Sequence, residues 1–251
     1  MESYKLYNSA VELLFDPIKH RYSVDGVVVD GVTTILKVIN KPALVNWSAN
    51  MSAGYVEKNL KPGVALDEVQ IMELVDGAKK AHRVRADQTA SLGTLAHAWF
   101  DDHFSGRAPT TPVNPELRRM TGAFLKFADT HKVEVLETER RLYSQRFKFA
   151  GTVDLICKVD GELTVADYKT GSGIYAEMLA QCGGYHLCYE EETGTVPSRH
   201  MLINCNAKGE LTVAVSANIV VNQEAFLDAL NLSRRMKALA DDMKAIKTPI
   251  L

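Results

Sequence analysis

The sequence contains only four cysteines, and no two of them are spaced as a CxxC pair. Such pairs hold structural zinc ions or carry out thiol–disulfide chemistry, so neither kind of site is indicated. Free thiols packed as small apolar side chains in a reducing compartment explain the cysteines better. They are Cys157, Cys182, Cys188 and Cys205.

Long apolar runs and targeting segments are also missing. No stretch approaches the length of a transmembrane helix, and residues 1–7 lack the basic and apolar regions of a signal peptide. We therefore expect a protein without membrane contact that stays in the cytosol. The chain also lacks a phosphate-binding loop of the GxxxxGK[ST] type, so any ATP-driven activity would have to come from a partner protein.

An excess of basic residues is absent, because 29 Lys and Arg stand against 31 Asp and Glu, for a net charge of −2. Proteins that coat nucleic acid by general electrostatics are usually basic, so this balance argues against a passive coat. It is compatible with a nuclease, since acidic metal ligands lower the net charge while local basic patches contact phosphates. Hydrophobic residues make up 46% of the 251 residues, which is enough for a sizeable core.

The spacing of apolar residues predicts a mixed α/β domain. The expected strands cover 12–15, 20–24, 27–29, 133–143, 149–159, 163–169, 199–205 and 211–216. The expected helices are a short one ending at 39, followed by 43–59, 66–78, 88–103, 116–131, 175–192 and 222–247. This order suits a central mixed sheet with helices on both faces. We expect a single domain, with an N-terminal hairpin and helical segment (1–90), a core (91–220) and a C-terminal helix (221–251).

The most informative segment is the hairpin over residues 151–171. Asp160-Gly161 is a two-residue turn between two apolar runs, and such a turn fixes the register of the strands on either side of it. In that register Asp154 lies directly opposite Asp167, with their Cβ atoms roughly 5 Å apart. Lys169 lies on the same face as Asp167, one step further along.

Two facing carboxylates between apolar strands repel each other, and a divalent cation such as Mg²⁺ removes that repulsion. The ammonium group of Lys169 can then orient a water, help to deprotonate it, or offset charge that develops on a phosphate. The alternative is that both aspartates are ordinary polar residues at strand ends and Lys169 is solvated. The combination of all three favours a metal-dependent site for phosphodiester hydrolysis.

Five short motifs follow one another between residues 93 and 185. They are Gly93-Thr-Leu-Ala-His97, Glu139, Gly151-Thr-Val-Asp154, Asp167-Tyr-Lys169-Thr and Gln181-Cys-Gly-Gly-Tyr185. Together they resemble the PD-(D/E)XK nuclease superfamily, specifically its RecB-type exonuclease branch. Nearer the N-terminus, Val32-Thr-Thr-Ile-Leu and Leu44-Val-Asn-Trp47 are similar to the first segment of phage and mitochondrial genome maintenance exonucleases.

The resemblance implies a restriction-endonuclease-like fold, with a mixed central sheet flanked by helices and a helical N-terminal addition. It implies a deoxyribonuclease dependent on Mg²⁺ or Mn²⁺, an exonuclease that acts on single- or double-stranded DNA ends, in phage or bacterial recombination or repair. In this branch, Asp154, Asp167, the backbone carbonyl of Tyr168 and His97 would bind the metal. Lys169 would be the catalytic lysine.

Further residues gain roles from the same resemblance. Glu139 fits the upstream acid of the family, which either binds a second metal through water or only orients its neighbours. Gln181 and Tyr185, four residues apart on one helix face, would lie beside the active site and the DNA. Basic runs next to the motifs are either solvated faces or contacts to the DNA backbone; their candidate residues are Arg83, Arg85, Arg140 and Arg141.

Some relatives hold an iron–sulfur cluster with four cysteines that flank the nuclease core. Here no cysteine precedes Cys157, so no iron–sulfur cluster is expected. Two other functions stay open: a catalytically inactive nuclease-like module that binds DNA or serves as a scaffold, and a nuclease that acts on RNA. Inactive members usually lose the lysine or a carboxylate, and this chain keeps both. The sequence indicates no oligomeric state.

Overall fold

The computed structural model describes residues 1–246 and contains two compact units, each of which is described by itself. Residues 1–39 and 96 onward form the larger unit, and residues 40–95 form the smaller one. The N-terminal strands therefore group with the predicted core rather than with the helical segment that follows them. The assignment of the whole chain to a single domain stays a prediction. Between residues 1 and 246, no helix combines the length and apolarity needed to cross a bilayer.

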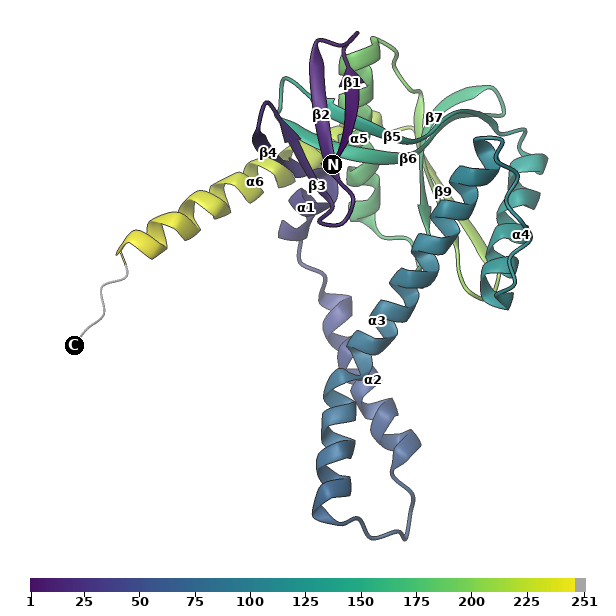
Figure 1. The fold of residues 1–251 in the computed structure, drawn as a ribbon, viewed down its shortest axis with the longest axis vertical. Helices are drawn as coiled ribbons and strands as arrows, with labels where there is room; N and C mark the ends of the chain where they lie inside the picture. The colour runs from purple at the N-terminus through teal and green to yellow at the C-terminus, as the bar shows by residue number, and fades with distance from the viewer. Residues whose placement is uncertain (247–251) are drawn as a thin grey trace. The chain divides into compact units, whose positions relative to one another are not determined.

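A nine-stranded mixed sheet forms the centre of the larger unit (Figure 1). Its strands are β1 (Glu2–Leu6), β2 (Val11–Asp16), β3 (Arg21–Val24), β4 (Val27–Gly31), β5 (Glu134–Ser144), β6 (Phe149–Val159), β7 (Glu162–Lys169), β8 (Arg199–Cys205) and β9 (Leu211–Ser216). Its helices are α1 (Val32–Ile35), the 3₁₀ turn η1 (Leu36–Val38), α4 (Pro115–Thr130), α5 (Ala176–Thr193), α6 (Ile219–Ile246) and the last residues of α3 (Glu68–Phe104). The predicted fold, a mixed sheet flanked by helices, is confirmed.

The pairing around β6 leaves one stretch of that strand between two partners. Along one edge β6 is paired with β5, antiparallel from Phe149 to Lys158. Along the other edge, β4 pairs with Phe149 and Ala150, and β7 pairs with Leu155 to Val159. Residues 151–154 lie between these two pairings. The side chain of Asp154 therefore comes from a place where the strands on this edge diverge.

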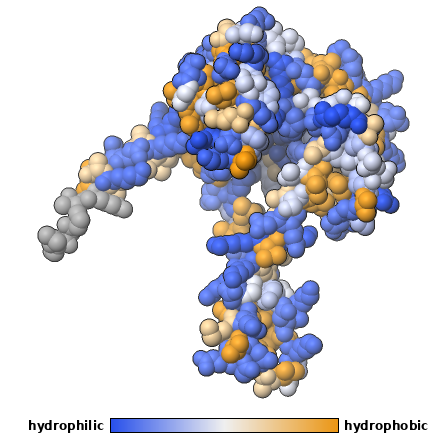
Figure 2. All heavy atoms as spheres, in the orientation of Figure 1, coloured by the Kyte–Doolittle hydropathy of each residue, from blue (hydrophilic) through white to orange (hydrophobic). Residues whose placement is uncertain are grey.

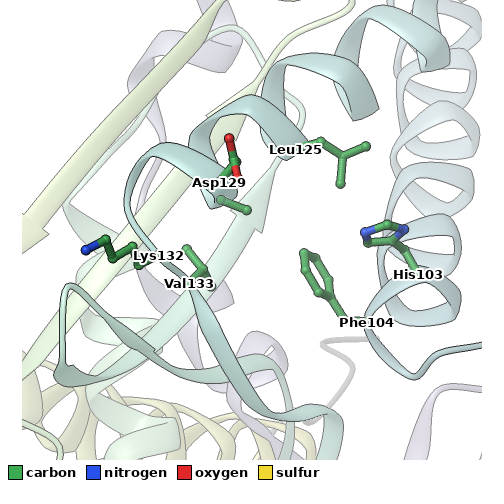
Figure 3. Close-up of a pocket in the computed structure, with 7 residues that line it drawn as sticks. His103, Phe104, Leu125, Asp129, Lys132 and Val133 are labelled. Carbon is green, nitrogen blue, oxygen red and sulfur yellow. The ribbon is translucent and has the colours of Figure 1, made fainter.

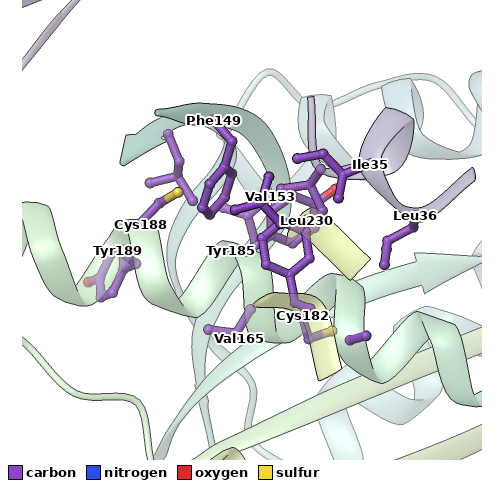
Figure 4. Packing of buried hydrophobic residues seen from close by; sticks show 14 of the residues in the cluster. Ile35, Leu36, Phe149, Val153, Val165, Cys182, Tyr185, Cys188, Tyr189 and Leu230 are labelled. Atoms are coloured by element: carbon purple, nitrogen blue, oxygen red, sulfur yellow. The ribbon is translucent and has the colours of Figure 1, made fainter. Parts of the chain in front are cut away.

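The main core lies between the sheet and helices α5 and α6 (Figure 4). Both faces of the central strands are buried, so β6 and β7 are apolar along most of their length, as is usual for strands covered on both sides. The largest core side chains that are fully buried include Phe149, Phe226 and Leu202. This packing fixes the strands from which the predicted site residues project.

Two consecutive glycines on α5 allow α6 to pack closely against it. A Cβ atom on Gly183 would lie 2.2 Å from the backbone oxygen of Asn222, and one on Gly184 would lie 2.9 Å from the ring of Phe226. Real side chains do not tolerate such distances, so the missing Cβ atoms are what permits the contact. Gln181 and Tyr185 are on this same helix, and its seating on the core therefore affects their positions.

The smaller unit is a pair of helices. α2 (Pro42–Asn59) packs against the first part of α3, where Ser52 Oγ donates to the carbonyl of Ala78 at 2.9 Å. Gly77 lies against the ring of Tyr55, at a distance that would leave no room for a Cβ atom. The predicted helices 66–78 and 88–103 are one continuous helix of 37 residues, because the charged segment between them is also helical.

Other differences are small. Strand β1 was not expected, and the other strands agree with the prediction to within about two residues, which is the usual uncertainty of element ends. The C-terminal helix begins three residues earlier than expected and is described as far as Ile246. The predicted last helical residue, Lys247, and the remainder of the predicted C-terminal segment lie outside the described residues.

Candidate active site

The register of the central hairpin agrees with the prediction from its turn. Val159 faces Glu162 and Leu155 faces Ala166, so the ladder ends one step before Asp154 and Asp167. At that step the Asp154 carboxylate accepts a hydrogen bond from the backbone N–H of Tyr168 at 2.8 Å. The carboxylate thus occupies the position where the two strands begin to diverge, and Asp154 as a whole residue is 9% exposed.

His97, Glu139 and Asp154 bring three potential metal-ligating atoms together. Each residue offers one such atom, and the three atoms lie within 4.8 Å of one another. His97 Nδ1 is 3.5 Å from Asp154 Oδ1 and 3.9 Å from Glu139 Oε1. These residues come from α3, β5 and β6, so the cluster forms only when all three elements are in place.

Glu139 reaches the cluster through an irregular stretch of β5. Thr138 faces Leu155 and Arg140 faces Val153, which places Glu139 beside Asp154. The register shifts between Val135 and Glu137, and Glu139 has a φ of 47°. A non-glycine residue in the left-handed region is uncommon and strained, and such residues concentrate at functional sites.

Asp167 and Lys169 form a second group next to this cluster. The ammonium of Lys169 makes an ion pair with Asp167 Oδ2, and it also donates to Gln181 Oε1 at 3.1 Å. The amide of Gln181 donates to Asp167 Oδ1 at 3.0 Å and to the hydroxyl of Tyr185 at 2.8 Å. Gln181 therefore contacts the two predicted catalytic groups on β7, and Tyr185 contacts Gln181.

The charged side chains of these two groups shift one another's pKa values. Burial alone lowers the pKa of His97, but Asp154, Asp167 and Glu139 outweigh it and raise that pKa to about 9. Burial and the charge of Asp154 raise the pKa of Glu139 to about 7. Burial favours the neutral form of Asp154 too, yet the positive charges of His97 and Lys169 hold its pKa below the ordinary value.

On β7, Asp167 and Lys169 each shift the pKa of the other in the direction opposite to the effect of burial. Burial raises the pKa of Asp167 to about 7, with Asp154 adding to the rise and Lys169 opposing it. Burial lowers the pKa of Lys169, but Asp167 and Asp154 outweigh this and raise it above the ordinary value. Lys169 is therefore positively charged at neutral pH. Carboxylates that hold protons near pH 7 in a buried site indicate a place where a cation would be favourable.

The donor set fits a divalent cation. Two carboxylates and an imidazole are suitable ligands for Mn²⁺, and carboxylates also suit Mg²⁺. Of the predicted metal ligands, Asp154 and His97 lie in the cluster, joined by Glu139. Asp167 lies beside it, engaged by Lys169 and Gln181. Tyr168 donates its N–H to Asp154, while its ring packs against His97 and Phe100.

Asp101 is a neighbour of the cluster that was not among the predicted site residues. It is one turn beyond His97 on α3, and its carboxylate accepts hydrogen bonds from Thr138 and Arg107. Thr138 precedes Glu139 on β5, so Asp101 ties the histidine-bearing helix to the strand that carries the acid. The four-residue spacing from His97 was the signal in the sequence.

The four predicted arginines are in two different environments. Arg140 pairs with Glu137 and Glu192, and Arg141 pairs with Glu139 and lies over the rings of Tyr4 and Phe15. Both side chains are less than 20% exposed. Arg83 and Arg85 are exposed residues of the smaller unit. Their contacts to DNA stay predictions.

A surface pocket occurs elsewhere in the larger unit, between the end of α3 and α4 (Figure 3). Its lining includes His103, Phe104, Leu125 and Asp129. None of the predicted catalytic or metal-binding residues lines it. We therefore place the candidate active site at the charged cluster and not at this pocket.

Comparisons with known proteins bear on the family of the chain. A family model described as the PD-(D/E)XK nuclease superfamily matches residues 115–250. No curated protein matches the chain. Among solved structures, that of SSO0001 is 13% identical, with a TM-score of 0.32, and the match covers 76% of this chain and 86% of that one.

The alkaline exonuclease LHK-Exo from Laribacter hongkongensis is similar to the chain at 12% identity, with a TM-score of 0.29 and coverage of 79% of this chain and 99% of that one. The structure of LHK-Exo in complex with dAMP gives the same identity and coverage, with a TM-score of 0.30. The family model alone matches more than half of the chain. This protein therefore belongs to the PD-(D/E)XK nuclease superfamily.

Proposed function

We propose that the chain is a divalent-metal-dependent exonuclease that hydrolyses phosphodiester bonds of DNA. The observation that carries the proposal is the convergence of His97, Glu139 and Asp154 beside a buried ion pair of Asp167 and Lys169. A cluster of this kind has no evident structural use, since it places several carboxylates within a largely buried region. Membership in a nuclease superfamily supports the same conclusion.

His97, Glu139 and Asp154 would hold the cation, either Mg²⁺ or Mn²⁺. When bound, the cation would supply Lewis-acid polarisation of a phosphoryl oxygen and would lower the pKa of a nearby water. His97 must be neutral to act as a ligand. Because the nearby carboxylates raise its pKa to about 9, it holds a proton at neutral pH, and that proton would leave on metal binding. Glu139, whose pKa is about 7, would lose its proton in the same step.

Lys169 would stabilise negative charge as it develops on the phosphate. Its raised pKa keeps it protonated at neutral pH, so it acts as a fixed positive charge and not as a base. Asp167 and Gln181 hold its ammonium from two sides. This arrangement sets the position of the charge before the substrate arrives, which is the condition for effective electrostatic catalysis.

The substrate, setting and compartment are parts of the same proposal. DNA ends, single- or double-stranded, are the substrate that the motif set of the RecB-type exonuclease branch implies. A recombination or repair partner protein and a cytosolic location fit that setting.

The test is cleavage of end-labelled single- and double-stranded DNA, and of RNA of the same sequence, with Mg²⁺, Mn²⁺ or a chelator. We expect metal-dependent cleavage of DNA that falls by about 1,000-fold or more in Lys169→Ala and in Asp154→Asn. Lys158→Ala and Asp160→Asn are matched controls, because they remove a partly exposed lysine and an exposed aspartate of the same hairpin. Both controls should keep wild-type activity.

Other outcomes would contradict parts of the proposal. Equal cleavage by wild type and both site variants would show that the activity comes from a contaminant. DNA binding without cleavage at any metal concentration would favour the scaffold function, and preferential cleavage of RNA would overturn the choice of substrate. A closed circular DNA tests the mode of attack, since an exonuclease degrades the linear form and leaves the circle intact.

A further inference from the structure

The last turns of α6 carry apolar residues that the rest of the larger unit leaves exposed. Leu232, Met236, Leu239, Met243 and Ile246 are between 47% and 68% exposed. They are spaced alternately four and three residues apart, which is the heptad spacing of a helix that pairs with another helix. The spacing makes them one continuous stripe, which we call the α6 seam.

Within the larger unit, this part of the helix has no layer to pack on. Every residue from 234 to 246 is exposed, on all sides of the helix. The nearest attachments to the body are Arg234, which donates to the carbonyl of Phe147, and Lys237, whose ammonium is 2.6 Å from the carboxylate of Asp30. Beyond these contacts α6 leads away from the sheet (Figure 1), and apolar surface is visible along it (Figure 2).

An isolated helix of this length is marginally stable in water, so its stability depends on packing of an apolar face. The seam is the only such face on this segment, and it continues the side of α6 that carries the buried Ala229. If the α6 seams of two copies packed together, they would bury on the order of 1,000 Å² of accessible surface in total, near the lower limit for a specific interface.

The charges beside the seam indicate what covers it. In a heptad, the residues that flank the apolar positions are paired across the interface in a way that depends on helix direction. Arg235 and Asp242 occupy equivalent flanking positions, seven residues apart, on the same side of the seam. When two copies of α6 run antiparallel with Met236 against Leu239, Arg235 of each copy faces Asp242 of the other.

The residues on the opposite flank of the seam, and a comparison with a parallel pair, also favour the antiparallel arrangement. On the opposite flank of the antiparallel pair, Ser233 faces Ala240, so no like charges meet. In a parallel pair, Arg235 would face the uncharged Ala240 and gain no partner. Asp242 would then face Lys247, which lies outside the described residues. The antiparallel pair gives both charges of each copy a partner. The antiparallel arrangement also places the two bodies at opposite ends of the helix pair.

We propose that the C-terminal half of α6 is a homodimerisation surface, where the seams of two copies pack antiparallel and two Arg235–Asp242 ion pairs form. The occupant of the seam is thus a second copy of this chain. This proposal goes beyond the nuclease function and does not depend on it. Two heptads form a short interface, so the dimer dissociates on dilution.

The test is sedimentation equilibrium of the full chain over a wide range of protein concentration. We expect a reversible monomer–dimer equilibrium for the wild type and a monomer for Leu239→Lys at the same concentrations. Val220→Lys is the matched control, because Val220 is an exposed apolar residue of α6 outside the seam and is 62% exposed. It should dimerise as the wild type does. Circular dichroism of each variant shows that the fold is retained.

Charge exchange tests the partner and the direction together. Arg235→Glu or Asp242→Arg alone places two like-charged pairs in the dimer and should weaken it by about tenfold. The double variant restores opposite charges and should return the dissociation constant to near the wild-type value. A wild type that is monomeric throughout, or a double variant as weak as the single ones, would overturn the proposal.

Discussion

Glu139 illustrates how a single residue can escape prediction from the sequence. The order of the motifs assigned Glu139 to the site. Which residue of β6 lies beside it could not be predicted, because that depends on where β5 departs from regular pairing. A left-handed conformation at a non-glycine residue leaves no pattern in the sequence, because glycine is the usual marker of such a position. The ligand types at the site were therefore predictable, while the convergence of Glu139 with His97 and Asp154 needed the structure.

Two buried histidines form a polar network that includes none of the proposed catalytic groups. His200 accepts a hydrogen bond from the amide of Asn222 at 2.9 Å, and its other ring nitrogen is 2.9 Å from His186. His186 in turn approaches Glu190 at 3.3 Å. Burial, together with the neighbouring His186, lowers the pKa of His200 to about 3.

This network predicts loss of stability in acid. The pKa of His200 is lower in the folded chain than the ordinary value of 6.5, so the unfolded chain takes up the proton first as the pH falls. The stability is complete above pH 6.5 and decreases towards pH 3, by about 3 to 5 kcal/mol if His200 acts alone. Urea unfolding measured at several pH values gives the slope.

The variant His200→Gln separates this effect from the titration of carboxylates. It removes the titrating ring, so the free energy of unfolding should depend less steeply on pH between 6.5 and 4 than in the wild type. The comparison concerns the slope, since the substitution also lowers stability at every pH. Identical slopes for both proteins would show that His200 is not the group responsible.

The contact between α5 and α6 offers a test at the scale of elements. Gly183→Ala should lower the free energy of unfolding by about 1 to 3 kcal/mol, because the new methyl group would meet the backbone of Asn222. The matched control is Gly122→Ala in α4, where nothing lies within 4 Å of the added atom. That substitution should stabilise by up to about 1 kcal/mol, since alanine favours helix. Denaturant unfolding of both variants measures the difference, and equal effects would contradict the close-packing argument.

The hairpin marked by a glycine turn was predicted with its register, while two elements without a clear mark, the first strand and the middle of α3, were missed. Asp160-Gly161 led to the observed register of β6 and β7. The turn after β1 consists of Tyr7, Asn8 and Ser9 in left-handed conformations, so the first strand carried no recognisable signal. The middle of α3 has charged residues where an apolar stripe was sought, although lysine, alanine and arginine favour helix by themselves.

At the scale of the whole molecule, cation binding should be coupled to folding. A ligand that binds only the folded chain stabilises it, by about 2.7 kcal/mol at 100 times its dissociation constant. For a chain of this size we expect Mn²⁺ to raise the melting temperature by about 5 to 10 °C relative to a chelator. Thermal unfolding followed by circular dichroism measures the shift without any reference to catalysis.

Substitutions of two of the proposed metal ligands test whether these residues bind the cation. Glu139→Gln and Asp154→Asn should each remove most of the Mn²⁺-dependent shift, because each takes away one of three convergent donors. Asp160→Asn, on the exposed turn of the same hairpin, should keep it. A shift that survives in both site variants would place the cation elsewhere in the chain.

The heptad spacing in the last helix was present in the sequence but could be interpreted only once the fold was known. Apolar residues at this spacing usually face the core of their own domain. Only the structure shows that the buried face of α6 ends near Ser233 while the apolar pattern continues to Ile246. The oligomeric proposal therefore depends on knowing where the body of the protein stops.

The stretch of β6 between its two partners on one edge has a consequence for how this chain can vary. β4 holds Ala150 and β7 holds Leu155, so the distance along the strand from one to the other is set at both ends. Adding or deleting one residue there would turn every following side chain to the opposite face or detach a neighbouring strand. We therefore expect chains descended from the same ancestor to gain and lose residues in many of their loops while the length of this stretch stays constant.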